Sequence, residues 1–260
     1  MNILITGSSS GIGYHTGVKL LKRGDFVYFT THLDSQVKSL EEKLRHLNIS
    51  NQYMVMKLDI TLEKDRKKLY DLDIDVLINN AAIGVGGSIL DLNISRVKEN
   101  FEVNVFSTIE MIQTYAASLF LNQKKGKTIV MASLAGIIPI PFMESYCATK
   151  ASLITFITAL RRELTFIKSD LEVCLVEPGI YITGFNEVMI DNKEEKSMFQ
   201  DIYPQITCFQ KKLFKLLGKK NLDSISNKVV KATVSRNTKL IYRAPLSQVV
   251  GAKIYMLLFK

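Results

Sequence analysis

Short apolar runs alternate along the chain with stretches in which apolar residues have helical spacing. Tyr14–Arg23 is such a stretch, and Gly24 after it is a typical helix end. The alternation predicts an α/β fold, in which a doubly wound parallel sheet of about seven strands has helices on both faces. The predicted strands are Asn2–Thr6, Phe26–Thr30, Tyr53–Leu58, Val76–Asn79, Thr128–Ala132, Glu172–Glu177 and a seventh near Leu240–Tyr242.

Residues 1–260 are predicted to form one domain, because no internal repeat, low-complexity tract or linker interrupts the pattern. A chain of this length can bury a large core. Its net charge of +9 suits contact with nucleic acid, acidic lipid or an anionic cofactor. No nucleic-acid motif accompanies the charge, so a nucleic-acid partner is not expected.

The cysteines and the apolar content bear on location. Cys147, Cys174 and Cys208 have neither metal-site nor disulfide spacing, so we expect reduced thiols, no metal, and Cys174 in the core. The chain starts almost at its first strand, which leaves no room for a signal peptide. Its most apolar region, Ile129–Met143, is too interrupted for a spanning helix. We therefore expect a cytoplasmic protein.

A glycine-rich loop, Thr6–Gly13, lies between the first predicted strand and the first helix. Glycines let a backbone approach a pyrophosphate closely, and a helix N-terminus favours its negative charge. The spacing is Gly-x-x-x-Gly-x-Gly, which differs from the commoner Gly-x-Gly-x-x-Gly. The loop predicts a dinucleotide site, and the alternative is an ordinary glycine-rich turn.

Tyr146 and Lys150 lie four residues apart, with Ser133 thirteen residues before the tyrosine. Residues four apart share one face of a helix, so the ammonium can approach the phenol. A nearby positive charge lowers the pKa of a tyrosine, which would suit it for acid–base catalysis near neutral pH. A Ser133 hydroxyl could hold a substrate carbonyl against the phenol. Alone, the pair could also be two surface residues of a helix.

Six segments, in chain order, resemble motifs of the short-chain dehydrogenase/reductase family, and the resemblance covers most of the chain. It implies a Rossmann-type domain that binds NAD(P) and interconverts an alcohol and a ketone or aldehyde. The sequence is most similar to the branch of 17β-hydroxysteroid and retinol dehydrogenases. The segments are Thr6–Gly13, Asp59, Asn79–Ala82, Asn104, the set Ser133, Tyr146 and Lys150, and Pro178–Gly179 with Thr183.

The resemblance assigns a role to each segment. Tyr146 would give a proton to the substrate oxygen, Lys150 would bind the ribose, and Asn104 would hold a water in line with that lysine. Asp59 would contact the adenine ring, and Pro178–Thr183 would contact the carboxamide of the nicotinamide. Ala82 stands where the family usually has glycine. The expected cofactor-binding residues are Gly7, Ser9, Ser10, Gly11, Ile12, Gly13, His32, Asp59, Ile60, Asn80, Ala81, Tyr146, Lys150, Pro178, Gly179 and Thr183.

The end of the second predicted strand bears on the choice between NADP and NAD. A carboxylate there would bind the ribose 2′-hydroxyl of NAD and repel a 2′-phosphate. The strand ends in Thr30-Thr31-His32, with no carboxylate, so we favour NADP. His32, Thr31, Ser9 and Ser10 could donate hydrogen bonds to a phosphate. Asp34 could reach back, which leaves NAD open, and His32 could equally be a solvated loop residue.

A basic amphipathic stretch at 209–220 falls where the family places its substrate lid, here about 185–222. Such a stretch can also lie on a membrane surface as a peripheral contact, and the two readings are compatible. Apolar residues of the lid and near Ser133 suit a lipophilic substrate, or they simply pack the core. They are Phe185, Val188, Met189, Ile190, Met198, Phe199, Ile202, Tyr203, Ile137, Ile138, Ile140, Phe142 and Met143.

In this family, the helix that carries Tyr146 and the preceding long helix, here about Ser95–Leu121, commonly pack against their copies in a second chain. The resemblance therefore predicts a homodimer or homotetramer. Apolar surface for this contact would come from Ile109, Ile112, Phe156 and Ile157. Other functions remain as alternatives: a non-catalytic dinucleotide sensor or scaffold, an epimerase or dehydratase, and a membrane-surface protein. The complete Ser, Tyr and Lys set favours the oxidoreductase.

Overall fold

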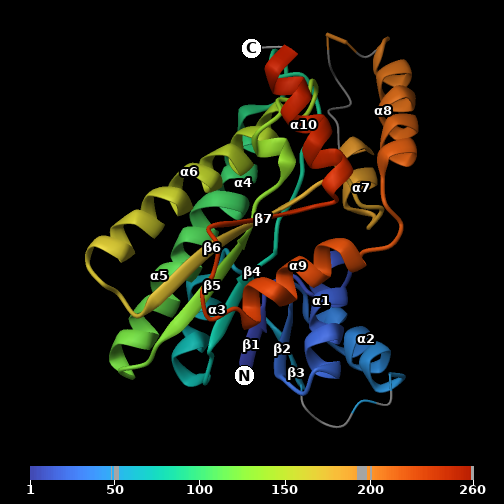
Figure 1. Ribbon diagram of the computed structural model, residues 1–260. Helices are drawn as coiled ribbons and strands as arrows, with labels where there is room; N and C mark the ends of the chain where they lie inside the picture. Colours follow the sequence, from blue (N-terminus) through green and yellow to red (C-terminus); the bar gives the residue numbers. More distant parts are fainter. Residues whose placement is uncertain (48, 50–52, 192–197, 200, 259–260) are drawn as a thin grey trace.

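The computed structural model describes residues 1–47, 49, 53–191, 198–199 and 201–258. Seven parallel strands form one sheet in the order β3-β2-β1-β4-β5-β6-β7 (Figure 1). The order reverses where β1 pairs with β4. The strands are β1 (Asn2–Ile5), β2 (Phe26–Thr31), β3 (Tyr53–Lys57), β4 (Val76–Asn79), β5 (Gly126–Met131), β6 (Leu171–Pro178) and β7 (Ile241–Ala244).

Helices cover both faces of this sheet, as the sequence predicts (Figure 1). Successive strand residues point to opposite faces. In β1, Ile3 and Ile5 join the core cluster that contains α1, α2 and α9, whereas Leu4 joins the cluster that contains α5. The helices are α1 (Gly11–Lys22), α2 (Asp34–Arg45), α3 (Glu63–Arg66), α4 (Ile94–Phe101), α5 (Ser107–Leu121), α6 (Glu144–Phe166), α7 (Phe185–Asp191), α8 (Tyr203–Leu217), α9 (Asp223–Val234) and α10 (Leu246–Leu258).

The long helix predicted for Ser95–Leu121 is divided by a π-helical turn at Glu102–Phe106, which separates α4 from α5. Within this turn Asn104 is buried, and its side chain bonds to both backbone groups of Ile83 beyond β4. An extra residue in a helical turn is often found at functional sites. The turn therefore brings α4 and α5 against the segment that follows β4.

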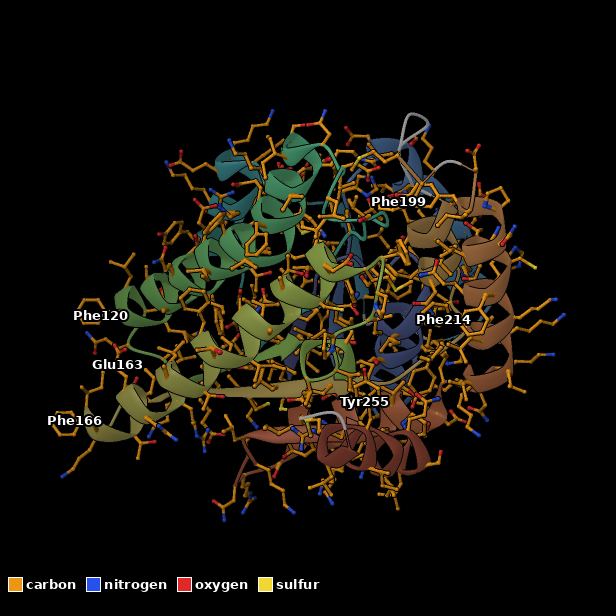
Figure 2. The ribbon with its side chains drawn as sticks, turned by 90° about the horizontal axis from the view of Figure 1, so that it is seen from above. Phe120, Glu163, Phe166, Phe199, Phe214 and Tyr255 are labelled. Carbon is orange, nitrogen blue, oxygen red and sulfur yellow. The ribbon has the colours of Figure 1, made fainter. Side chains whose placement is uncertain are left out.

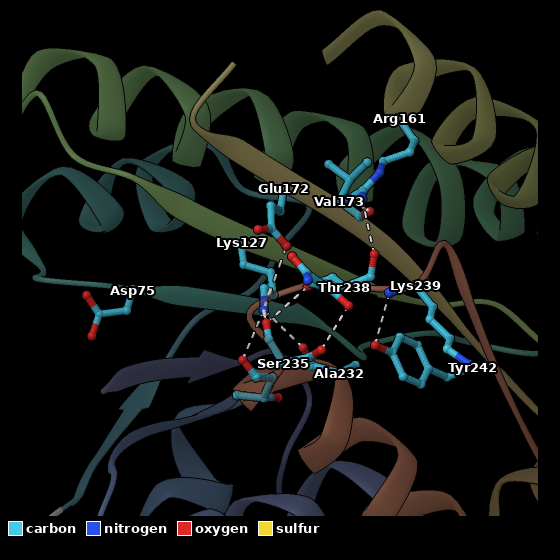
Figure 3. Close-up of polar contacts among 12 residues, drawn as sticks. Asp75, Lys127, Arg161, Glu172, Val173, Ala232, Ser235, Thr238, Lys239 and Tyr242 are labelled. Carbon is cyan, nitrogen blue, oxygen red and sulfur yellow. Dashed lines mark hydrogen bonds and ion pairs between the residues drawn. The ribbon is translucent and has the colours of Figure 1, made fainter. Parts of the chain in front are cut away.

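A buried lysine fixes α9 and the chain after it to the start of β5. The Lys127 ammonium donates hydrogen bonds to the carbonyls of Ala232, Thr233 and Ser235, at 3.1, 3.2 and 2.6 Å (Figure 3). These carbonyls end α9, where a helix leaves acceptors without partners. Arg161 of α6 donates to the Thr238 carbonyl at 3.1 Å. Both contacts lie at the amino ends of the strands and hold the chain that leads into β7.

Beyond the carboxyl ends of the strands lie α7, α8 and α10 (Figure 1). The lid predicted at 185–222 thus contains α7 and α8, although 192–197 and 200 lie outside the described residues. Cys174 is buried in the core as predicted. Over the part of the chain that the structure describes, no helix is both long enough and apolar enough to cross a membrane.

Candidate active site

A cavity of about 1370 Å³ lies at the carboxyl ends of the strands, next to the point where β1 meets β4. This is where open parallel sheets bind their ligands. Of the sequence-predicted site residues, all but Gly13 and Asn104 line it. Those that do are Gly7, Ser9, Ser10, Gly11, Ile12, His32, Asp59, Ile60, Asn80, Ala81, Ser133, Tyr146, Lys150, Pro178, Gly179 and Thr183.

The loop between β1 and α1 needs glycine at two positions that line the cavity. Gly7 and Gly11 have φ angles of 60° and 58°, a region that L side chains rarely adopt. A Cβ on Gly7 would also lie 2.8 Å from Ala81 Cα. The loop therefore runs tightly against the chain after β4 and exposes backbone to the cavity. The N-terminus of α1 points its free N–H groups at the same space, which suits a phosphate.

Glycine is needed at position 13 for a reason that differs from the one expected from the sequence. It is buried behind the loop, and a Cβ there would lie 2.5 Å from Asn80 Nδ2. That amide donates to the carbonyls of Thr6 at 3.0 Å and Gly7 at 2.8 Å. The Thr6 hydroxyl in turn accepts from the backbone N–H groups of Asn80 and Ala81, at 2.9 and 3.0 Å. Gly13 thus makes room for the amide that shapes the loop, and does not itself line the cavity.

The end of the cavity near β2 and β3 carries His32, Gln36 and Asp59. His32 is exposed, and Asp34 lies in the first turn of α2. Asp59 accepts hydrogen bonds from the Thr61 backbone and hydroxyl, at 3.0 and 2.7 Å. The Oε1 of Gln36 is buried with no partner among the described residues. Sequence reasoning missed Gln36, although its place in the first turn of the helix that follows the second strand is a usable signal.

Ser133, Tyr146 and Lys150 all line the cavity. Ser133 follows β5, where its hydroxyl accepts from Ala135 N at 3.0 Å and reaches Pro178 O at 3.4 Å. Tyr146 and Lys150 lie on α6, and the Lys150 ammonium is 5.6 Å from the centre of the tyrosine ring. The ammonium donates to the Met131 carbonyl at 2.9 Å. Helical spacing from α6 and the end of β5 therefore bring the three side chains to one place.

Burial sets the ionisation of this pair. It raises the pKa of Tyr146 above its ordinary value, with contact from Ser133 acting in the opposite direction. It also lowers the pKa of Lys150 to about 8. Burial of the phenol therefore acts against the lower pKa expected from Lys150, and that lowering stays a prediction. The ammonium is held by the Met131 carbonyl.

Asn104 lies behind the cavity and does not line it. Its Oδ1 accepts from Ile83 N at 2.8 Å, and its Nδ2 donates to Ile83 O at 2.9 Å. The same amide lies 3.2 Å from the Thr149 hydroxyl on α6. The contacts of Asn104 thus connect the π-helical turn, the chain after β4 and the helix of Tyr146.

The segment after β6 is held by a residue that sequence reasoning missed. Gln248 of α10 accepts from Ile180 N at 2.6 Å and donates to Leu217 O at 2.7 Å. A Cβ on Gly179 would lie 2.0 Å from the Gln248 Oε1, so glycine is needed for this close contact. Gln248 therefore joins the Pro178–Thr183 segment to the end of α8. No sequence motif marks it.

The side of the cavity next to Tyr146 is apolar. The Phe185 ring lies 5.6 Å from the Tyr146 ring, and Phe214 of α8 faces the same space. The remaining apolar residues predicted for this wall do not all reach it: Met198 and Ile202 are exposed, and Ile137 is partly buried outside the cavity lining. Val188, Met189, Ile138, Ile140 and Met143 line the cavity; Ile190 is buried, and Phe142, Phe199 and Tyr203 contact one another.

Comparisons with known proteins agree on one family. The family model for short chain dehydrogenases matches residues 1–194. A probable short-chain type dehydrogenase/reductase of Helicobacter pylori is 29% identical over 262 residues, which cover 98% of this chain and 92% of that protein. An NADPH-dependent 3-dehydrocapnine reductase of Ornithobacterium rhinotracheale is 28% identical over 264 residues, with the same two coverages.

Solved structures support the fold. A short chain dehydrogenase/reductase from Burkholderia phymatum in complex with NAD matches with a TM-score of 0.84 and 17% identity, over 98% of this chain and 92% of that one. A closed form of serine dehydrogenase complexed with NADP⁺ matches with a TM-score of 0.78 and 20% identity, over 95% and 96%.

Proposed function

This chain belongs to the short chain dehydrogenase family, and we propose that it interconverts an alcohol and a ketone or aldehyde with NAD(P) as cofactor. The observation that carries the proposal is the meeting of Ser133, Tyr146 and Lys150 in the cavity that also contains the Gly7–Ile12 loop. One part of the cavity suits a phosphate, and the adjoining part offers a proton donor beside an apolar wall.

The residues of the cavity fit a dinucleotide. The glycine loop and the N-terminus of α1 would hold the pyrophosphate, and Asp59 and Ile60 would lie by the adenine. Lys150 would bind the nicotinamide ribose, with Asn80 and Ala81 beside it. Pro178, Gly179 and Thr183 would contact the nicotinamide, on a segment that Gln248 keeps in place. When bound, the nicotinamide supplies or accepts a hydride at the substrate carbon.

In reduction, the Tyr146 phenol would give its proton to the substrate oxygen, and the Ser133 hydroxyl would donate a hydrogen bond to that oxygen. With a pKa of about 8, Lys150 is mostly protonated at neutral pH, so its charge would favour the phenolate that remains. Asn104 would act by positioning, because its hydrogen bonds hold the turn behind the site. In oxidation the same groups would act in reverse.

We expect NADPH to be preferred to NADH, with kcat/KM about tenfold higher, equivalent to about 1.4 kcal/mol. No carboxylate ends β2, and His32 lines the cavity as a donor for a 2′-phosphate. His32→Asp should move the preference toward NADH, because the new carboxylate would repel that phosphate. The NADPH dependence of the Ornithobacterium relative is consistent with this preference. A native preference for NADH would contradict the role of His32 and make Asp34 the next residue to test.

The substrate that the cavity suits best is a lipophilic alcohol or ketone, such as a steroid, retinoid or fatty-chain compound. Its support is the apolar wall beside Tyr146, where Phe185, Met143 and Phe214 gather in one core cluster. The predicted lid, with α7 and α8, would close over such a substrate.

We expect the protein to form a dimer or tetramer through α5 and α6. Ile112 and Ile157, predicted to lie at this contact, instead pack in the core between helix and sheet, so exposed apolar surface comes from Phe156 and Phe106, both about half exposed. Light scattering over a wide concentration range should give twice or four times the chain mass. Phe106→Glu with Phe156→Glu should reduce it toward the monomer.

The matched control is Phe120→Glu with Phe166→Glu, because these rings project from the far ends of α5 and α6 (Figure 2). This pair should leave the mass unchanged. A monomeric mass for the unaltered protein at every concentration would rule out self-association.

A further inference from the structure

The positive charge of the chain is concentrated near its end. Residues 202–260 contain twelve Lys and Arg and a single acidic residue, Asp223, whereas residues 1–201 contain 22 basic and 24 acidic residues. The segment that includes α8 and α10 therefore carries a net charge of +11, against −2 for the rest of the chain, and neither helix contains a carboxylate. Clustered charge of one sign attracts partners of the opposite sign.

On α8, the apolar face is wider than the part that the protein body covers. Phe209, Leu213 and Leu216 share one side of the helix, at spacings of four and three, and all three are exposed. Gln210 and Phe214 face the body instead. The neighbouring exposed side is basic, with Lys211, Lys212 and Lys215, and Lys219 and Lys220 follow the helix.

α10 has a second exposed apolar stripe. Val249 and Ala252 are its buried contacts, and Lys253 is its only charged residue. An exposed apolar face on the outer side of a helix commonly marks a site of contact with a protein or a membrane. The stripe consists of Leu246, Val250, Ile254 and Leu257, at spacings of four, four and three.

Both helices reach the cavity, and Leu216 is the stripe residue that lines it. Leu216, Leu217 and Tyr255 line the cavity and are also exposed, so its rim is apolar. Seen from above, α8 and α10 border the cavity on two sides, with Phe214 and Tyr255 toward its centre (Figure 2). The hydrogen bond from Gln248 to Leu217 O joins the start of α10 to the end of α8. The two helices therefore flank one opening, and apart from Leu216 their exposed stripes lie outside its lining.

We propose that this α8–α10 surface, formed by the two apolar stripes and the lysines beside them, docks on membranes that contain anionic lipid. Apolar side chains next to lysines are the pattern of helices that lie in a membrane interface. Lysines close to an anionic bilayer are attracted to its negative surface. Docking would turn the cavity mouth toward the lipid; that consequence for a lipophilic substrate rests on the proposed function, whereas docking itself does not.

A second copy of the chain fits this surface less well. A two-fold contact places the same patch against itself, so the lysines of α8 would face their own copies. Like charges brought together in an interface are unfavourable. An anionic bilayer satisfies both the apolar stripes and the lysines.

The test uses the absence of tryptophan from the chain. Leu216→Trp and Ile254→Trp each place a single fluorophore on one stripe. Phe120→Trp is the control, because Phe120 is 84% exposed and Leu216 81%, yet it projects from the opposite end of the molecule (Figure 2). Vesicles of equal parts phosphatidylcholine and phosphatidylserine should shift the emission of both stripe variants to shorter wavelength and leave Phe120→Trp unchanged. The measurement needs neither nucleotide nor activity.

Charge reversal tests the lysines separately. Lys212→Glu with Lys215→Glu should lower the vesicle partition coefficient, measured by sedimentation, by at least about tenfold. Lys228→Glu with Lys231→Glu makes the same change of charge on exposed positions of α9 and should lower it less. No emission shift on either stripe, or an equal shift at Phe120, would overturn the proposal. A shift that depends on protein concentration without vesicles would identify a second copy as the occupant instead.

Discussion

Tyr146→Phe should lower turnover by at least about 10²-fold, the contribution that general acid catalysis typically makes. The substitution removes the phenolic proton and keeps the ring that packs 5.6 Å from Phe185. Burial raises the pKa of Tyr146, so the phenol is protonated at neutral pH and ready to donate during reduction. Steady-state reduction of a substrate accepted by the native enzyme would measure the loss, with titration of NADPH showing little change in affinity.

Tyr70→Phe is the matched control, because it removes the same hydroxyl from a partly exposed tyrosine outside the cavity. It should leave turnover unchanged. Lys150→Met should damage both turnover and nucleotide affinity, since Lys150 is assigned to the ribose and to the charge beside the phenol. Near-normal turnover in Tyr146→Phe, where chemistry limits the rate, would remove Tyr146 from the mechanism and leave only a nucleotide-binding fold.

Gly13→Val should abolish nucleotide binding while the domain stays folded. The added side chain would enter the space of the Asn80 amide and displace it from the Thr6 and Gly7 carbonyls. Overpacking of this kind costs about 1–3 kcal/mol, which weakens binding about 5- to 150-fold when the loop absorbs all of it. Calorimetric titration with NADPH measures the affinity, and circular dichroism with thermal unfolding checks the fold.

His15→Val provides the control for Gly13→Val, because it adds a β-branched residue to the exposed side of the same helix. Its NADPH affinity should match that of the native protein. If folded Gly13→Val bound NADPH as tightly as the native chain, the loop would not be the phosphate site.

The sheet and the meeting of the site segments follow from the sequence for a simple physical reason. Strands buried on both faces appear as short apolar runs, and parallel strands bring their carboxyl ends to one edge. Thr6–Gly13, Ser133 and Pro178–Gly179 each follow such a run, so they reach the same cavity although the sequence separates them widely. The seventh strand, expected near Leu240–Tyr242, is confirmed as Ile241–Ala244.

Other features depend on tertiary contacts that spacing does not reveal. The helical pattern through Asn104 gives no sign of the π-helical turn, which accompanies hydrogen bonds to Ile83, 21 residues away. Gln248 is a polar residue in a mostly apolar helix, and its partner Ile180 lies 68 residues earlier. The pKa of Tyr146 is governed by burial, whereas the sequence shows only that Lys150 is near.

The most direct test of the proposed oxidoreductase follows the hydrogen that is transferred to carbon. The protein would be mixed with NADPH carrying deuterium at both C4 positions and with a panel of lipophilic ketones and aldehydes. Mass spectrometry should find at least one alcohol with one deuterium on its carbinol carbon, and Tyr146→Phe should form far less of it. If the protein binds NADPH but forms no deuterated alcohol from any compound, the result would contradict catalysis and favour a nucleotide-binding sensor.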